Sequence, residues 1–122
     1  MKISKFLSDD FLMWSGNDDI VIPMLSIGAT GVISVWANVM PHEVSSMVSL
    51  FHNGKKEEAL KIQLDNLDLI NALFIEVNPI PVKEAMNLMG FEVGGYRLPL
   101  WEMNEDNKAK LKSVMEKAGL VK

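Results

Sequence analysis

The 122-residue chain contains no cysteine, which excludes disulfide bonds and thiolate metal sites. This absence fits a cytoplasmic protein, since disulfides are rare in that compartment. The chain also lacks any apolar run of about 18 residues, the length that a membrane-spanning helix needs. Asp9 and Asp10 interrupt the apolar residues near the N-terminus, where a signal peptide would need an unbroken apolar core. We therefore expect no membrane association.

Basic residues are few, and no cluster of them is visible. The 12 Lys and Arg are scattered among 16 Asp and Glu, giving a net charge of −4. Nucleic-acid-binding domains gather basic residues on one face, so we expect no nucleic-acid partner. The two histidines, His42 and His52, have no paired metal ligands, and a helix start explains Asp18 and Asp19 better than a cation site does. We expect neither a metal nor a cofactor.

Two short apolar runs, residues 11–15 and 31–35, are bounded by turn residues and predict strands buried on both faces. Between them we expect a helix over residues 20–27, with Asn17 as its N-cap. A further helix follows Pro41. Its apolar face is formed by Val44, Met47, Val48 and Phe51, at helical spacing. This strand–helix–strand–helix order is typical of α/β folds.

The second half of the sequence predicts helices only. The first covers residues 55–74, the second begins with Asn78 as N-cap and Pro79 at its first position, and the third begins after Asn104. Between the last two, the glycines and Pro99 indicate a loop. The expected buried stripe of the first helix comprises Leu60, Leu64, Leu67, Ile70 and Phe74.

Two strands cannot form a complete parallel sheet, because both outer edges would be open and both faces are apolar. The remaining strands must come from upstream sequence, from a partner chain or from a domain-swapped copy. The helix expected at the start of the chain has already begun at Lys2, which favours upstream sequence as the source of the remaining strands.

Four stretches identify a resemblance that extends over nearly the whole chain. They are SGNDD (15–19), GATGVISVWAN (28–38), LFIEVNPIPVK (73–83) and RLPLWEMNE (97–105). In order and spacing they resemble the C-terminal portion of the dihydrodipicolinate synthase family, a group of pyruvate-dependent Schiff-base aldolases. The sister branch, the N-acetylneuraminate lyases, is not similar at NPIPVK, which favours the synthases.

The resemblance implies a (β/α)8 barrel, the TIM barrel, followed by a three-helix C-terminal extension, commonly in a tetramer. Residues 1–53 would hold the end of helix 6, strand 7, helix 7, strand 8 and helix 8, and residues 54–122 the extension. The implied lyase reaction condenses pyruvate with aspartate semialdehyde in lysine biosynthesis, through a Schiff base between pyruvate and a lysine of strand 6. That lysine and the catalytic tyrosine would lie upstream of this chain.

The resemblance places Gly16 and Ile33 in the pyruvate pocket, largely through main-chain groups, and makes Asn38 a weaker candidate for ordering the adjacent loop. On the residues alone, a turn glycine and a core isoleucine explain the first two better. Trp36 stands where the family often has a smaller residue, and it packs either internally or against another subunit. Tyr96 and Arg97 match no catalytic position.

The chain alone is therefore expected to be inactive and to need the missing N-terminal half of the barrel as its partner. Two alternatives remain open. One is a stand-alone, non-catalytic helical interaction module, and the other is a piece of an N-acetylneuraminate lyase.

Overall fold

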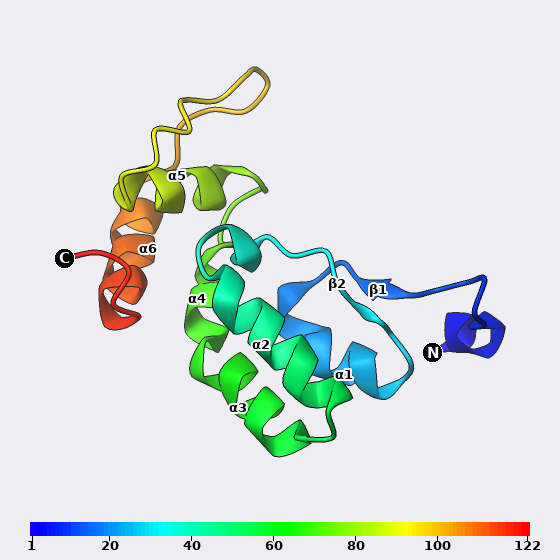
Figure 1. The fold of residues 1–122 in the computed structure, drawn as a ribbon. Helices are drawn as coiled ribbons and strands as arrows, with labels where there is room; N and C mark the ends of the chain where they lie inside the picture. Colours follow the sequence, from blue (N-terminus) through cyan, green and yellow to red (C-terminus); the bar gives the residue numbers. More distant parts are fainter. The chain divides into compact units, whose positions relative to one another are not determined.

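A computed structural model describes residues 1–122 and confirms the α/β class. Contacts divide the chain into two compact units, Met1–Asp65 and Asn66–Lys122, called here the N-terminal and C-terminal units. In Figure 1 the first runs from blue to green and the second from green to red. The predicted boundary between the barrel and its helical extension, after residue 53, is a different division, and it stays a prediction.

The N-terminal unit contains the only sheet, in which β1 and β2 run parallel (Figure 1). Trp14 pairs with Gly31 and Ser15 with Val32, and α1 joins the two strands. The elements of this unit are η1 (Lys2–Phe6), β1 (Trp14–Ser15), η2 (Asp18–Ile20), α1 (Val21–Ser26), β2 (Gly31–Val32), η3 (Trp36–Asn38), α2 (Pro41–His52) and α3 (Lys56–Asp65).

Both strands are shorter than the apolar runs that predicted them. In the first apolar run, the backbone of Phe11 forms hydrogen bonds with the backbone of Ser8 instead of pairing with β2. The N–H of Ile33 still donates to the carbonyl of Ser15, and the chain then turns into η3, where the N–H groups of Val35 and Trp36 donate to the carboxylate of Asp18. Asn17 makes no side-chain capping bond, so its predicted capping role is wrong.

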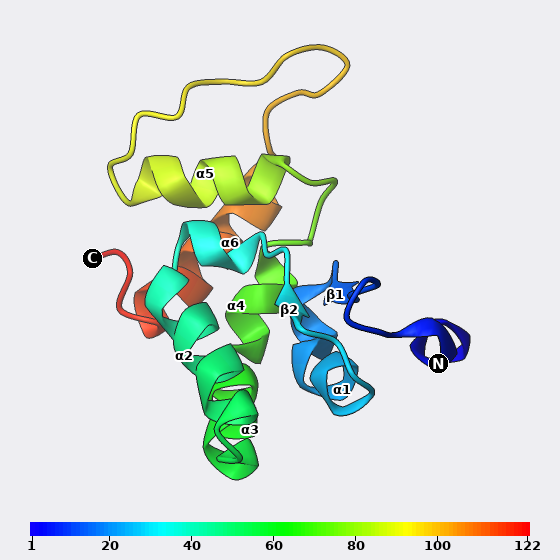
Figure 2. The same ribbon diagram turned by 45° about the vertical axis from the view of Figure 1, so that its right-hand side comes forward.

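The core of the N-terminal unit lies among its helices, of which α1 packs against both strands and α2 packs against α1, α3 and η3. Val21 and Leu25 of α1 are buried, as are Val44 and Met47 of α2. Val48 and Phe51, on the same predicted face of α2, are half-buried. The helices α2 and α3 lie side by side in both ribbon views (Figures 1 and 2).

The single helix predicted over residues 55–74 is wrong, since the chain forms α3 and then α4 (Leu67–Ala72), with a break at Asn66. Leu60 and Leu64 are exposed, while Ala59 and Gln63 are buried. Gln63 accepts a hydrogen bond from the N–H of Ile22 and donates one to the carbonyl of Asp19. These bonds turn α3 so that its leucines face outward.

The C-terminal unit comprises α4, α5 (Ile80–Leu88) and α6 (Glu105–Lys117), with α6 packed against both α4 and α5. Its core is supplied by Leu69, Ile70, Leu73, Ala85, Leu111 and Met115. Asn104 caps α6 as predicted, accepting a hydrogen bond from the N–H of Asp106. The start of α5 differs by one position: Pro79 is the N-cap and Pro81 lies in the first turn.

Candidate functional site

The carboxyl ends of β1 and β2 bring together the two residues that the resemblance places in the pyruvate pocket. Gly16 directly follows β1, and Ile33 directly follows β2. The N–H of Ile33 donates to the carbonyl of Ser15 at 2.9 Å, which fixes the backbone of Ile33 beside Gly16. In parallel α/β folds, ligands bind at this end of the strands.

Trp14 and Gly31 are paired in register, and Ile33 continues the pairing two positions after Gly31, so these three residues lie on one face of the pair, called here the open face. The exposed fractions are 49% for Trp14 and 75% for Ile33. The ring of Trp14 lies over Gly31, where a Cβ would be only 2.8 Å from its Cζ3 atom. The opposite face, with Ser15 buried, packs against α1.

Asp18 ties the two strand ends together, a role that the sequence did not reveal. Its side chain is 1% exposed, and its Oδ2 atom accepts hydrogen bonds from the N–H groups of Val35 and Trp36, both at 2.9 Å. The loop after β1 is thereby fixed to the turn after β2. An aspartate in the first turn of a helix looks the same in the sequence as one that makes such a cross-link, so no local signal could have found it.

Asn38 and Trp36 lie in the turn that follows β2. The Nδ2 group of Asn38 donates to the carbonyl of Val35 at 2.9 Å, closing its own turn. Its role in ordering a neighbouring loop stays a prediction. Trp36 is 0% exposed and packs inside the N-terminal unit. Internal packing is therefore the alternative that the structure supports for this residue.

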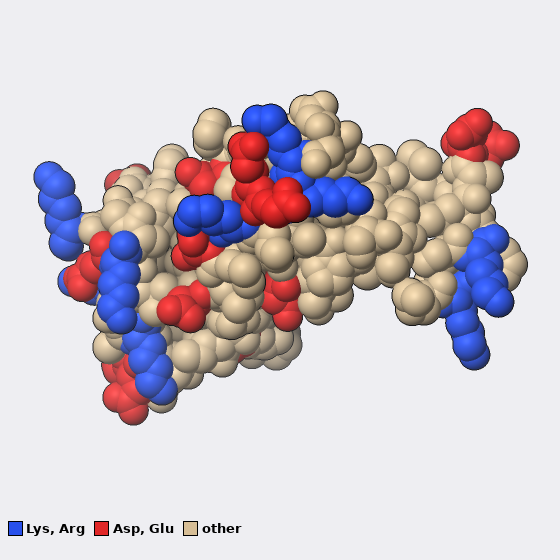
Figure 3. All heavy atoms as spheres, turned by 90° about the horizontal axis from the view of Figure 1, so that it is seen from below, with Lys and Arg blue, Asp and Glu red and all other residues tan.

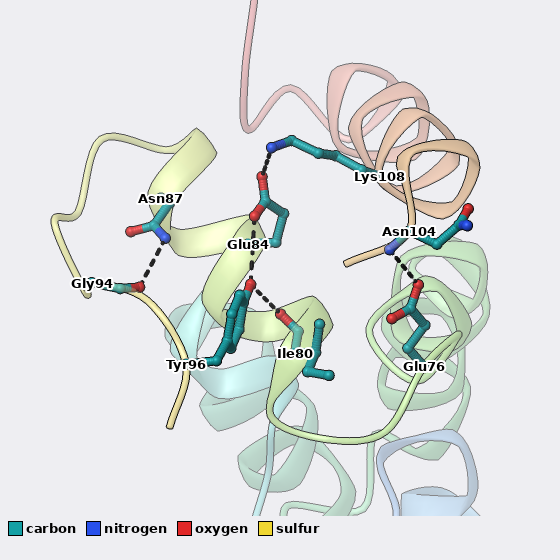
Figure 4. A network of polar contacts seen from close by, with 8 residues as sticks. All are labelled: Glu76, Ile80, Glu84, Asn87, Gly94, Tyr96, Asn104 and Lys108. Carbon is teal, nitrogen blue, oxygen red and sulfur yellow. Dashed lines mark hydrogen bonds and ion pairs between the residues drawn. The ribbon is translucent and has the colours of Figure 1, made fainter. Parts of the chain in front are cut away.

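A polar network in the C-terminal unit fixes the loop after α5 (Figure 4). The hydroxyl of Tyr96 donates to the carbonyl of Ile80 at 3.3 Å and approaches Glu84 at 3.5 Å, while Glu84 pairs with Lys108 at 2.6 Å. Burial raises the pKa of Tyr96 above 10.0, and the charge of Glu84 adds to this. The hydrogen bond to Glu84 is the main cause that raises the pKa of Lys108 above 10.5.

Two hollows of about 410 and 470 Å³ lie beside this loop, and neither includes a predicted site residue. Gly94, Gly95, Tyr96 and Leu100 line both hollows.

No group of three His, Asp or Glu side chains could hold a metal ion. On the face drawn in Figure 3, basic and acidic side chains are mixed rather than gathered by sign. No helix has the length and apolar character to cross a membrane.

The chain matches known proteins closely. The model of the dihydrodipicolinate synthetase family matches residues 1–118. The chain is 57% identical over 108 residues to 4-hydroxy-tetrahydrodipicolinate synthase of Clostridium novyi (strain NT), covering 88% of this chain and 36% of that protein. It is 52% identical over 122 residues to the Clostridium tetani enzyme of that name, covering 100% of this chain and 42% of the relative.

Solved structures that resemble this chain belong to the same family of synthases. The crystal structure of dihydrodipicolinate synthase from Aquifex aeolicus superposes with a TM-score of 0.93 at 43% identity, over 98% of this chain and 41% of that one. These names favour the synthases over the lyases. The chain spans about two fifths of the length of the relatives that it matches. Because the family model covers nearly all of its residues, the chain belongs to the dihydrodipicolinate synthetase family.

Proposed function

We propose that this chain supplies the last two strand–helix units and the C-terminal helical extension of a 4-hydroxy-tetrahydrodipicolinate synthase with a (β/α)8 barrel. The complete enzyme would condense pyruvate with aspartate semialdehyde in lysine biosynthesis. The observation that carries the proposal is the parallel pair β1 and β2, with Gly16 and Ile33 adjacent at its carboxyl end. The names of the relatives supply the reaction.

In this proposal, Gly16 and Ile33 form one wall of the pyruvate pocket. A Cβ at Gly16 would meet no atom within 4 Å in this chain, so nothing in the chain itself demands glycine there. A bound substrate close to the backbone would demand it. The carbonyl of Ser15 accepts from the N–H of Ile33 and fixes its backbone beside Gly16, so that the main-chain groups of both residues would line the pocket.

The chain alone is proposed to be inactive because it offers no suitable amine. A Schiff-base lysine needs a buried position that favours its neutral form. Neither strand contains a lysine. The pKa of Lys108 is raised, which favours the ammonium form and is opposite to what a nucleophile needs.

Trapping with borohydride tests this proposal. The chain incubated with pyruvate and borohydride should gain no mass, whereas a single-chain fusion to the unmatched part of the Clostridium tetani relative should gain the reduced pyruvate adduct. An adduct on the chain alone, or a folded fusion that traps no pyruvate, contradicts the proposal.

The variant Gly16→Ala separates a pocket role from a structural one. It should raise the KM for pyruvate in the fusion while leaving the thermal unfolding of the 122-residue chain unchanged, because the added methyl group has free space. An unchanged KM would remove Gly16 from the pocket.

We also propose a homo-oligomer for the complete enzyme, on the family resemblance alone, and light scattering of the fusion measures it.

A further inference from the structure

The turn between α2 and α3 contains Asn53 and Gly54, and no other asparagine in the chain is followed by glycine. Residues 52–55 are all exposed, and no hydrogen bond or ion pair holds the side chain of Asn53. The side-chain amides of Asn38 and Asn107, by comparison, each donate a hydrogen bond. Asn53 therefore combines an accessible, unbound amide with a following residue that has no side chain.

The end of α2 itself requires a glycine at position 54. The N–H of Lys55 donates to the carbonyl of Leu50 at 2.9 Å, and the N–H of Gly54 donates to the carbonyl of Phe51 at 3.1 Å. These two bonds form a Schellman turn, which ends a helix with one residue in the left-handed region. Gly54 has a φ of +81°, a value that L side chains disfavour. The glycine that ends the helix also leaves its own nitrogen unshielded beside Asn53.

We propose that Asn53 and Gly54 form a site of spontaneous covalent modification, at which Asn53 becomes aspartate or isoaspartate. The backbone nitrogen of Gly54 gives its proton to hydroxide and attacks the Cγ atom of Asn53. The N–Cγ bond forms, the Cγ–Nδ2 bond breaks, and Nδ2 takes a proton from water and leaves as ammonia. Water then opens the resulting cyclic imide at either carbonyl and restores a free carboxylate. The inference goes beyond the proposed function and does not depend on it.

The attack requires a local opening of the helix end. The N–H of Gly54 is bound to the carbonyl of Phe51, so the nitrogen has to be released before it can reach Cγ of Asn53. Helix ends open at a much lower free energy than the whole fold. A Cβ at Gly54 would meet no atom within 4 Å, so nothing packs over this turn. Opening of the last turn of α2, rather than unfolding of the chain, therefore exposes the site.

The modification changes the end of α2 and its contact with the strand pair. Isoaspartate carries the main chain through its Cβ atom, which lengthens the turn by one carbon and breaks the bond between Lys55 and Leu50. Either product adds a negative charge at the C-terminal end of the helix, where the helix dipole disfavours it. His52, the last residue of α2, lies with Nε2 2.8 Å from the carbonyl of Thr30, directly before β2. The segment that enters β2 should therefore be loosened as well.

The experiment incubates the 122-residue chain in mildly alkaline buffer, folded and in guanidinium chloride, and follows each asparagine by peptide mass spectrometry. Asn53 should give both aspartate and isoaspartate, the latter detected by enzymatic methylation of its carboxylate. In denaturant, Asn53 should react at least about tenfold faster than any other asparagine, because only Gly54 leaves the attacking nitrogen without a neighbouring Cβ. Folding should slow the reaction by less than about a thousandfold, the smallest factor expected if the whole chain had to unfold.

Two variants serve as matched controls. Asn53→Gln keeps an exposed amide but would have to form a larger ring, and it should stop the reaction at this position. Gly54→Ala, compared in denaturant where the strain at its φ has no effect, should slow the reaction at least about tenfold. In the modified folded chain, hydrogen exchange should show lost protection of the Lys55 N–H and unchanged protection at Met47 in the core.

Four results would overturn the inference. They are faster conversion at another asparagine, aspartate at position 53 without isoaspartate, a reaction slowed by about a thousandfold or more on folding, and full protection of the Lys55 N–H in the modified chain. The second result would show direct attack by water instead of by Gly54. The third would assign the reaction to the unfolded chain, and the fourth would show that the end of α2 tolerates the longer turn.

Discussion

At the scale of single residues, Asp18 is the position with the largest expected effect on the N-terminal unit. Asp18→Ala removes the acceptor for two N–H groups, those of Val35 and Trp36. Leaving a buried donor without a partner costs about 1–3 kcal/mol. We expect a loss of stability of at least that size, measured by urea denaturation of the chain.

The neighbouring Asp19 offers the control for this prediction. Its side chain is exposed, and only its backbone carbonyl is used, as the acceptor for Gln63. Asp19→Ala should therefore change stability by less than about 0.5 kcal/mol. Asp18→Asn keeps one oxygen acceptor and should lie between the two. Equal losses for Asp18→Ala and Asp19→Ala would show that the cross-link between the strand ends is not important.

At the scale of elements, Tyr96 connects α5 to the loop that follows it, and it is the only tyrosine in the chain. Burial and Glu84 raise its pKa above 10.0, so the folded state favours the neutral phenol. This contribution to stability is present below pH 10 and is lost as the pH rises through the folded pKa. Lys108, with its pKa raised above 10.5, loses its contribution in the same direction.

Absorbance near 295 nm reports the titration of Tyr96 directly. We expect its midpoint above pH 10.0 in the folded chain and at the ordinary value in urea. Glu84→Gln should lower the folded midpoint only in part, because burial is the larger cause. A folded midpoint equal to the unfolded one would show that the Tyr96 contacts do not persist in solution.

The helix α6 depends on its N-cap. Asn104→Ala removes the bond to the N–H of Asp106 and should cost about 1 kcal/mol, the usual effect of losing such a cap. Asn104→Asp keeps an acceptor and should retain stability. Urea denaturation compares the two variants, and a loss of the same size in both would assign the effect to something other than capping.

At the scale of the whole molecule, we expect the two units to contribute independently to the free energy of unfolding. Asp18 belongs to the N-terminal unit and Asn104 to the C-terminal unit. Changes at separate sites without shared partners usually add to within about 0.5 kcal/mol. The double variant Asp18→Ala/Asn104→Ala should lose the sum of the single losses, and a clear deviation in its urea denaturation would reveal coupling between the units.

Periodic patterns predicted the order of elements well, because apolar spacing follows from the geometry of helices and strands. They failed where the hydrogen bonds of a single side chain determine the rotation of a helix or the path of the chain after a strand. Gln63 sets the rotation of α3 through bonds to Asp19 and Ile22, against the leucine pattern. Asp18 accepts from the N–H groups of Val35 and Trp36, in the turn that follows β2. Contacts of this kind join positions far apart in the sequence and leave no periodic trace.

The candidate site was predictable only through resemblance. Gly16 and Ile33 are ordinary residues for a turn and a core, and their proximity depends on a pairing between strands that no local pattern encodes. Their place at one end of the strand pair followed once the parallel order was assumed.

The cross-link of Asp18 to Val35 spans only 17 positions, which bears on the order of folding. Loops of such length close on the order of 100 ns. We expect the strand pair to form early, because its contacts are local in sequence. In the proposed barrel, pairing of β1 and β2 with strands more distant in the sequence, rather than formation of this pair, would set the folding rate.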